Sequence, residues 1–104
     1  MSYLALRTVS VLLVLAAVSG HPACADVARG GQLARQWCAN CHIVDNNPSG
    51  VVPQGPPSFP AIAHSGKTAD QLRTFLSHPH GAMPDLALTR SEIDDLIGYI
   101  ETFR

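Results

Sequence analysis

The segment WCANCH, residues 37–42, combines side chains that bind metals and form covalent bonds. Cys38 and Cys41 are separated by two residues, and His42 follows directly. Two thiols at this spacing beside an imidazole suit three kinds of chemistry: a zinc site, a thiol–disulfide pair, or covalent attachment of haem. The rest of the sequence has to decide between them.

The first two kinds of chemistry lack the partners that they need. A structural zinc site takes four ligands, usually from a second cysteine pair or two spaced histidines. The motif supplies three, and no second cysteine pair exists in the chain. A thioredoxin-like pair begins a helix inside a βαβ unit, whereas this pair follows a predicted helix and has no strand pattern nearby. Both interpretations remain open, but neither is favoured.

Covalent haem attachment is the interpretation that uses every residue of the motif, since C-x-x-C-H is its signature. The thiols of Cys38 and Cys41 can add to the two vinyl groups of one porphyrin edge, and His42 can then direct its imidazole at the iron. A chain this short is also poor in core, so a bound group would help it to fold. We expect the apoprotein to be poorly ordered.

Residues 1–25 have the layout of a secretory signal peptide. A short region with Arg7 precedes the apolar stretch VSVLLVLAAV at residues 9–18, and Ala-Cys-Ala closes the segment at residues 23–25. A membrane span needs about 20 apolar residues, roughly twice this stretch. We therefore expect cleavage after Ala25, a periplasmic domain over residues 26–104, and no membrane span after cleavage.

Cleavage there would change both the charge and the cysteine content. It removes Arg7 and Cys24, so the net charge goes from −1 to −2 and the cysteine count from three to two. Phosphate binding needs clustered cations, and Lys67 is the only lysine in the chain, so we expect no nucleic acid partner. An uncleaved anchor and a lipoprotein acylated at Cys24 are the alternatives.

The chain also offers a second ligand for an iron atom. Met83 is the one methionine after residue 25, and it lies in a loop framed by Pro79 and Pro84. Methionine often fills gaps in a core, but this loop position favours a ligand. His78 or His80 could replace it, which would lower the reduction potential.

Three helices are predicted to position these residues. Apolar residues recur at helical spacing over residues 27–40, 68–78 and 90–103. Capping boxes begin the last two helices, with Thr68 and Gln71 in one and Thr89 and Glu92 in the other. These are the clearest helix starts in the sequence. The segment 44–66, rich in proline and glycine, predicts a long loop, and no segment has a convincing strand pattern.

A first helix, the CANCH motif, a Gly-Pro loop, a middle helix, a Met-Pro loop and a last helix follow one another along the chain. In this order the chain resembles the class I c-type cytochromes, the small monohaem electron carriers, over nearly all of residues 26–104. The resemblance implies an all-α fold of three main helices with long loops wrapped around one covalently bound haem c. It also implies that Cys38 and Cys41 carry the thioether bonds and that His42 and Met83 ligate the iron. The family's Gly-Pro segment places Pro56 as the residue whose carbonyl binds the ring nitrogen of His42.

The resemblance extends to helix packing. Family members pack a glycine of the first helix against an aromatic residue of the last, and Gly30 and Tyr99 match that pair. Many relatives have an aromatic residue where this chain has Ala34. We therefore expect a crossing that is looser or relies on Trp37.

A histidine and a methionine together fill both axial positions of the iron, so we expect an electron-transfer protein and not an enzyme. The resemblance implies a monomer that carries electrons from a dehydrogenase or quinol-oxidising complex to an oxidase or reductase. With a single lysine, docking should use an apolar patch near Ile43, Ala82 and Met83. The alternatives are a cytochrome subunit bound permanently to one dehydrogenase, and a haem peroxidase or gas sensor in which Met83 dissociates.

Overall fold

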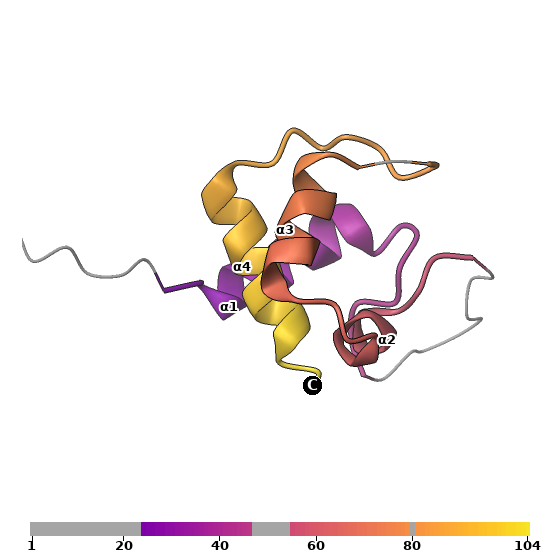
Figure 1. The fold of residues 1–104 in the computed structure, drawn as a ribbon, viewed down its shortest axis with the longest axis horizontal. Helices are drawn as coiled ribbons and strands as arrows, with labels where there is room; N and C mark the ends of the chain where they lie inside the picture. The colour runs from indigo at the N-terminus through magenta and orange to yellow at the C-terminus, as the bar shows by residue number, and fades with distance from the viewer. Residues whose placement is uncertain (1–23, 47–54, 80) are drawn as a thin grey trace, which may run out of the picture.

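The computed structural model describes residues 24–46, 55–79 and 81–104 (Figure 1). Every regular element in these ranges is a helix, which confirms the predicted all-α fold. No helix in the same ranges is both long and apolar enough to cross a membrane. Most of the predicted signal peptide and His80 lie outside the described residues, so the predicted boundary after Ala25 stays a prediction.

The first helix changes its winding before it reaches the motif. Helix α1 (Val27–Leu33) continues directly into a π-helical turn, η1 (Ala34–Cys38). In η1 the N–H of Ala39 donates to the carbonyl of Ala34, five residues earlier, at 3.0 Å. A π turn is wider than an α turn and is common at functional sites. The predicted helix over residues 27–40 is confirmed in place but ends at Cys38.

A short helix, α2 (Phe59–His64), lies inside the segment 44–66. The Ser58 hydroxyl caps it by accepting from the N–H of Ala61 at 3.2 Å. Pro60 falls in the first turn, where a missing N–H costs no bond within the helix. The prediction of an uninterrupted loop is therefore wrong here, because proline breaks the interior of a helix but not its start.

Helices α3 (Ala69–Ser77) and α4 (Arg90–Glu101) begin as predicted. In each, the threonine hydroxyl accepts from the backbone N–H three residues later at 3.2 Å, and that residue's side chain accepts from the threonine N–H at 2.8 Å. Arg73 joins the two helices through a hydrogen bond from Nε to Asp94 Oδ1 at 3.0 Å. This bond is the main reason why the pKa of Arg73 is raised.

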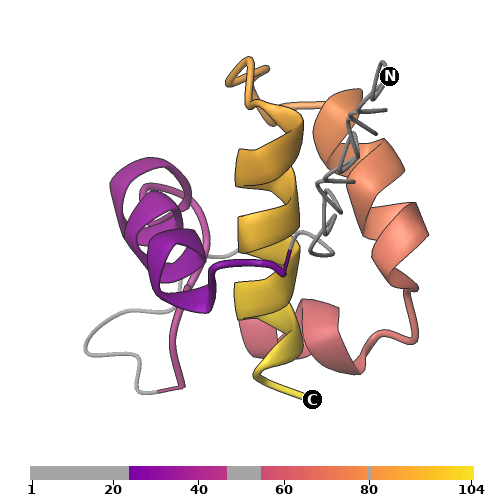
Figure 2. The same cartoon turned by 90° about the vertical axis from the view of Figure 1, so that its left-hand side faces the viewer.

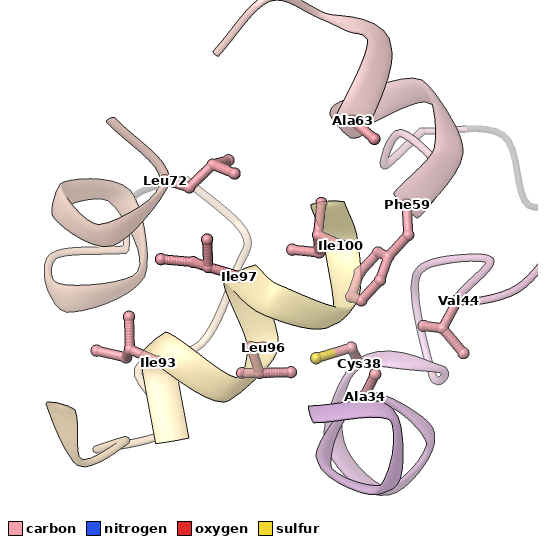
Figure 3. Packing of buried hydrophobic residues seen from close by; sticks show 10 residues of the cluster. All are labelled: Ala34, Cys38, Val44, Phe59, Ala63, Leu72, Ile93, Leu96, Ile97 and Ile100. Atoms are coloured by element: carbon pink, nitrogen blue, oxygen red, sulfur yellow. The ribbon is translucent and has the colours of Figure 1, made fainter. Parts of the chain in front are cut away.

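Helix α4 is the centre of the fold. It contacts α1, α2 and α3, and Figure 2 shows α1 and α3 on opposite sides of it. The buried side chains of α4 form the middle of the core, and Cys38 belongs to the same cluster, with its sulfur directed toward α4 (Figure 3). The members that α4 contributes are Ile93, Leu96, Ile97 and Ile100.

The closest approach of α1 to α4 is at Gly30. A Cβ atom at this position would lie 2.0 Å from the carbonyl oxygen of Asp95 and 2.9 Å from the Cβ of Tyr99. At Gly31 a Cβ would lie 3.1 Å from the Tyr99 ring. The predicted pairing of Gly30 with Tyr99 is confirmed, and the backbone of Asp95 is nearer still.

From Ala34 we expected a crossing that is looser or relies on Trp37. Both alternatives are wrong, because α1 and α4 approach closely at Gly30 and Trp37 is outside the core cluster. Ala34 is fully buried, whereas Trp37 is 48% exposed. A small residue at position 34 lets the two helices come together without an aromatic filler. Trp37 is left exposed at the start of the WCANCH segment.

Replacing Gly30 with alanine should destabilise the folded protein by about 1–3 kcal/mol, because the added methyl meets the backbone of α4. Urea unfolding followed by Trp37 fluorescence measures this. Gly31→Ala should cost less, since a tyrosine ring can yield where a backbone cannot. Gln32→Ala, on the exposed side of α1, should change stability by less than about 0.5 kcal/mol. Equal effects at positions 30 and 32 would contradict the tight crossing.

Candidate haem-binding site

The motif, the segment before α2, helices α2 and α3, and the loop after α3 line a partly open apolar cavity of about 590 Å³. The structure brings five predicted site residues to its wall: Cys38, Cys41, His42, Pro56 and Met83. Other wall residues, which the sequence did not single out for this role, are Pro57, Ile62, Lys67, Leu72, Phe75 and Leu86. A cavity with this volume and lining suits a large and mostly apolar group.

The motif folds around one carbonyl group. The oxygen of Cys38 accepts from the N–H of Cys41 at 3.1 Å and from the N–H of His42 at 2.9 Å. The two cysteines are free, with Cys38 buried and Cys41 exposed. Burial raises the pKa of the Cys38 thiol, so this sulfur stays neutral. The turn thus presents one thiol from the core and one from the surface to the same cavity.

The orientation of the His42 ring is set by a hydrogen bond between Nδ1 and the carbonyl oxygen of Pro57 at 2.7 Å. A carbonyl can only accept, so Nδ1 carries the proton and Nε2 keeps its lone pair for a metal. Such a bond holds the ring in place and strengthens it as a donor.

The acceptor of this bond is Pro57, one residue beyond the predicted Pro56. The register is set by a second bond, from the N–H of Phe59 to the carbonyl of Ile43 at 2.8 Å. This pairing aligns the two segments so that the carbonyl two residues before Phe59 meets His42. The sequence contains both prolines but not the pairing, so it could not choose between them.

The chain is anchored at three successive residues, beginning with the last residue of the motif. His42 bonds to Pro57, Ile43 to Phe59, and the hydroxyl of Tyr99 on α4 donates to the carbonyl of Val44 at 2.6 Å. The rings of His42 and Phe59 are 5.8 Å apart, and those of Phe59 and Tyr99 are 6.1 Å apart at a steep angle. A row of aromatic rings therefore connects the imidazole to α4.

Met83 reaches the cavity from the loop between α3 and α4. It also lines a smaller neighbouring cavity of about 50 Å³ that His42 shares. His78 is exposed at the end of α3 and is absent from both cavity walls, and His80 lies outside the described residues. Of the two candidate second ligands that the structure describes, Met83 is the one that lines the cavity together with His42.

This donor set fits haem iron better than a bare metal ion. Within residues 24–46, 55–79 and 81–104, no three histidine, cysteine or acidic side chains gather closely enough to hold a metal. One imidazole and one thioether are sufficient only when a porphyrin supplies the other four ligands. The apolar wall and the two free thiols at its edge fit the same macrocycle.

The helical fold, the C-x-x-C-H turn and the apolar cavity together define a small c-type cytochrome. Residues 25–100 match the family described as cytochrome c oxidase, cbb3-type, subunit III. The chain is also 36% identical over 103 residues to cytochrome c-552 of Bradyrhizobium diazoefficiens, and the match covers 98% of each chain. No solved structure matches it.

The chain therefore belongs to this family of c-type cytochromes. Membership means that it carries covalently bound haem c with iron and that it serves haem-based electron transfer with redox partners. The remaining questions are which side chains hold the iron, where the protein works and which molecules it meets.

Replacing Tyr99 with phenylalanine should cost about 1–3 kcal/mol in the free energy of unfolding, since the Val44 carbonyl loses its partner in a buried setting. Guanidinium unfolding of the haem-loaded protein, followed by haem absorbance, measures this. Ser65→Ala is the matched control, because it also removes a 2.6 Å hydroxyl-to-carbonyl bond, but an exposed one. If the two variants lose the same small amount, the Tyr99 bond does not hold the segment.

Proposed function

We propose that this protein is an exported monohaem electron carrier. Cys38 and Cys41 would hold the haem through thioether bonds, and His42 Nε2 and Met83 Sδ would bind its iron. The observation that carries the proposal is that all four side chains line the same apolar cavity. When bound, the haem supplies an iron that takes up and releases one electron.

The side chains around the cavity are suited to tuning this electron transfer. The Met83 thioether is a weak donor that favours the reduced state, which raises the reduction potential. The hydrogen bond from His42 to Pro57 strengthens His42 as a ligand, while the apolar wall keeps water away from the iron. With His42 and Met83 both bound, no position remains for a substrate.

Export is supported by the sequence of residues 1–25, with cleavage after Ala25. Ala25, the last residue before the proposed cleavage point, is exposed. Bacterial c-type cytochromes typically work outside the cytoplasm. We therefore place the mature domain, residues 26–104, in the periplasm as a monomer.

The partners we propose are a dehydrogenase or quinol-oxidising complex as donor and an oxidase or reductase as acceptor. Docking would use the apolar surface around Ile43, Ala82 and Met83, which are all at least partly exposed. Trp37, 48% exposed, lies on the cavity wall and can extend this surface. Lys67 is the only lysine in the chain, so a ring of lysines cannot steer the encounter.

A second candidate is a cytochrome subunit held permanently in a larger complex, a dehydrogenase or an oxidase. The description of the matching family, which names an oxidase subunit, supports this candidate. Size-exclusion chromatography of the native protein from its source separates the two. A carrier elutes at the size of one small domain, whereas a subunit elutes with its complex.

Met83→Leu should abolish the near-red band of a methionine-ligated ferric haem and lower the reduction potential, because leucine keeps the volume but has no sulfur. Absorbance spectroscopy and redox titration of the exported protein measure both. His78→Ala is the control and should leave both unchanged.

High-spin iron in the unaltered protein, or carbon monoxide binding without delay, would contradict ligation by Met83. The same result would support the peroxidase or gas-sensor alternative, in which the sixth position opens.

Docking should depend only weakly on salt, since a chain with one lysine has no ring of positive charge to steer the encounter. We expect the second-order rate of electron exchange with a small redox protein to change by less than about threefold between 0.05 and 0.5 M salt, whereas steered encounters fall steeply. Stopped-flow mixing measures the rate. Trp37→Ala should lower it at every salt concentration, whereas Gln32→Ala should not. A steep fall with salt would contradict apolar docking.

A further inference from the structure

Asp95 is a buried carboxylate that the haem site does not use. It lies on α4 and is 4% exposed, as the one buried charged residue in the described part of the chain. Its Oδ1 accepts from the backbone N–H of Asp26 at 2.8 Å. Its Oδ2 is buried and has no hydrogen-bond partner among the described residues.

The positive charge nearest to Asp95 compensates it incompletely. Arg29 Nη1 is 3.5 Å from Oδ2, an ion-pair distance without a hydrogen bond, and the arginine side chain is 47% exposed. Arg29 is also shared with Glu92, at 3.5 Å. A buried carboxylate costs several kcal/mol unless it has a charged and hydrogen-bonded partner. Asp95 has room for one more donor.

That donor can come from the chain itself, at the nitrogen already bound to Oδ1. Hydrolysis between Ala25 and Asp26 adds one water, leaving a carboxylate on Ala25 and an ammonium group on Asp26. The amide N–H has one hydrogen, but the ammonium has three, so it can keep Oδ1 and also reach Oδ2. Ala25 lies against Gly98, where an added Cβ would be 2.8 Å from the Ala25 Cβ. The peptide bond between Ala25 and Asp26 therefore lies next to α4 before cleavage.

We propose that Asp95 is a built-in binding site for the new N-terminal ammonium group of Asp26, so that removal of the signal peptide completes a buried ion pair. This inference rests on the proposed export and cleavage after Ala25, and not on the assignment of the iron ligands. Its consequence is that the processed chain is more stable than the same domain with a longer N-terminus.

The proposal also predicts a pH dependence. The charged groups facing the ammonium are Arg29 and the Asp26 carboxylate at the start of α1, and Asp95 and Glu92 on α4. An α-amino group ordinarily has a pKa of about 7.7–8.0, and a buried carboxylate partner raises it. The added stability is then fully present below about pH 7.7 and is lost as the pH rises through the higher folded value.

The test compares two haem-loaded proteins, one starting at Asp26 and one starting at Ala25, which differ by one residue and by the position of the N-terminal charge. At pH 7 the chain starting at Asp26 should melt about 4–8 °C higher, the shift expected for one charge-assisted hydrogen bond in a domain of this size. Asp95→Asn should abolish the difference. Asp94→Asn removes the neighbouring carboxylate, which pairs with Arg73, and should preserve it. Equal melting temperatures for the two unaltered chains would overturn the proposal.

If Asp95→Asn does not fold, the unaltered protein still decides. The rate at which cyanate modifies the α-amino group, measured against pH by mass spectrometry, gives its pKa separately from Lys67. A raised pKa supports the ion pair, and an ordinary one overturns it. An exported protein whose mass shows a different N-terminus also overturns it, while the Met83 spectra judge the electron-carrier proposal independently.

Discussion

The close contact between the backbones of α1 and α4 is the constraint on which the haem-binding segment depends. With no side chain at Gly30, α1 lies directly on the carbonyl of Asp95. One turn later on α4, Tyr99 packs against Gly31 and donates to Val44. Residues 95 and 99 thus hold both ends of the stretch from Asp26 to Val44. The C-x-x-C-H turn lies between these two fixed points. Helix α4 therefore positions the turn by holding the chain on both sides of it.

The core and the cofactor site are one structure. Cys38 and Leu72 are buried members of the hydrophobic cluster and also line the 590 Å³ cavity. A domain this small buries too little apolar surface to be stable by a wide margin. Haem c supplies the missing apolar area, and its covalent bonds prevent loss of that area. Binding of the cofactor and folding of the chain are therefore coupled.

Local signals in the sequence were sufficient where a structure depends on neighbouring residues. The capping boxes at Thr68 and Thr89 depend on residues three positions apart, so both helix starts could be predicted. Helix α2 had a signal too, because Ser58 precedes apolar residues at helical spacing, but Pro60 and the prolines before the helix concealed it. The π turn, the choice of Pro57 over Pro56 and the burial of Asp95 depend on contacts between distant segments. The spacing of residues along the sequence therefore does not predict these three features.

The two halves of the proposed iron site are held with different strength, and the reason lies in α4. The His42 ring is fixed by Pro57 and by the ring row through Phe59 to Tyr99. Met83 comes from a loop whose shape rests on local features: Gly81 has a φ of +69°, and the Ala87 N–H donates to Asp85 at 2.8 Å. A loop held by its own turns opens more easily than a segment tied to the central helix. Changes of ligation should therefore begin at Met83, while His42 keeps its place.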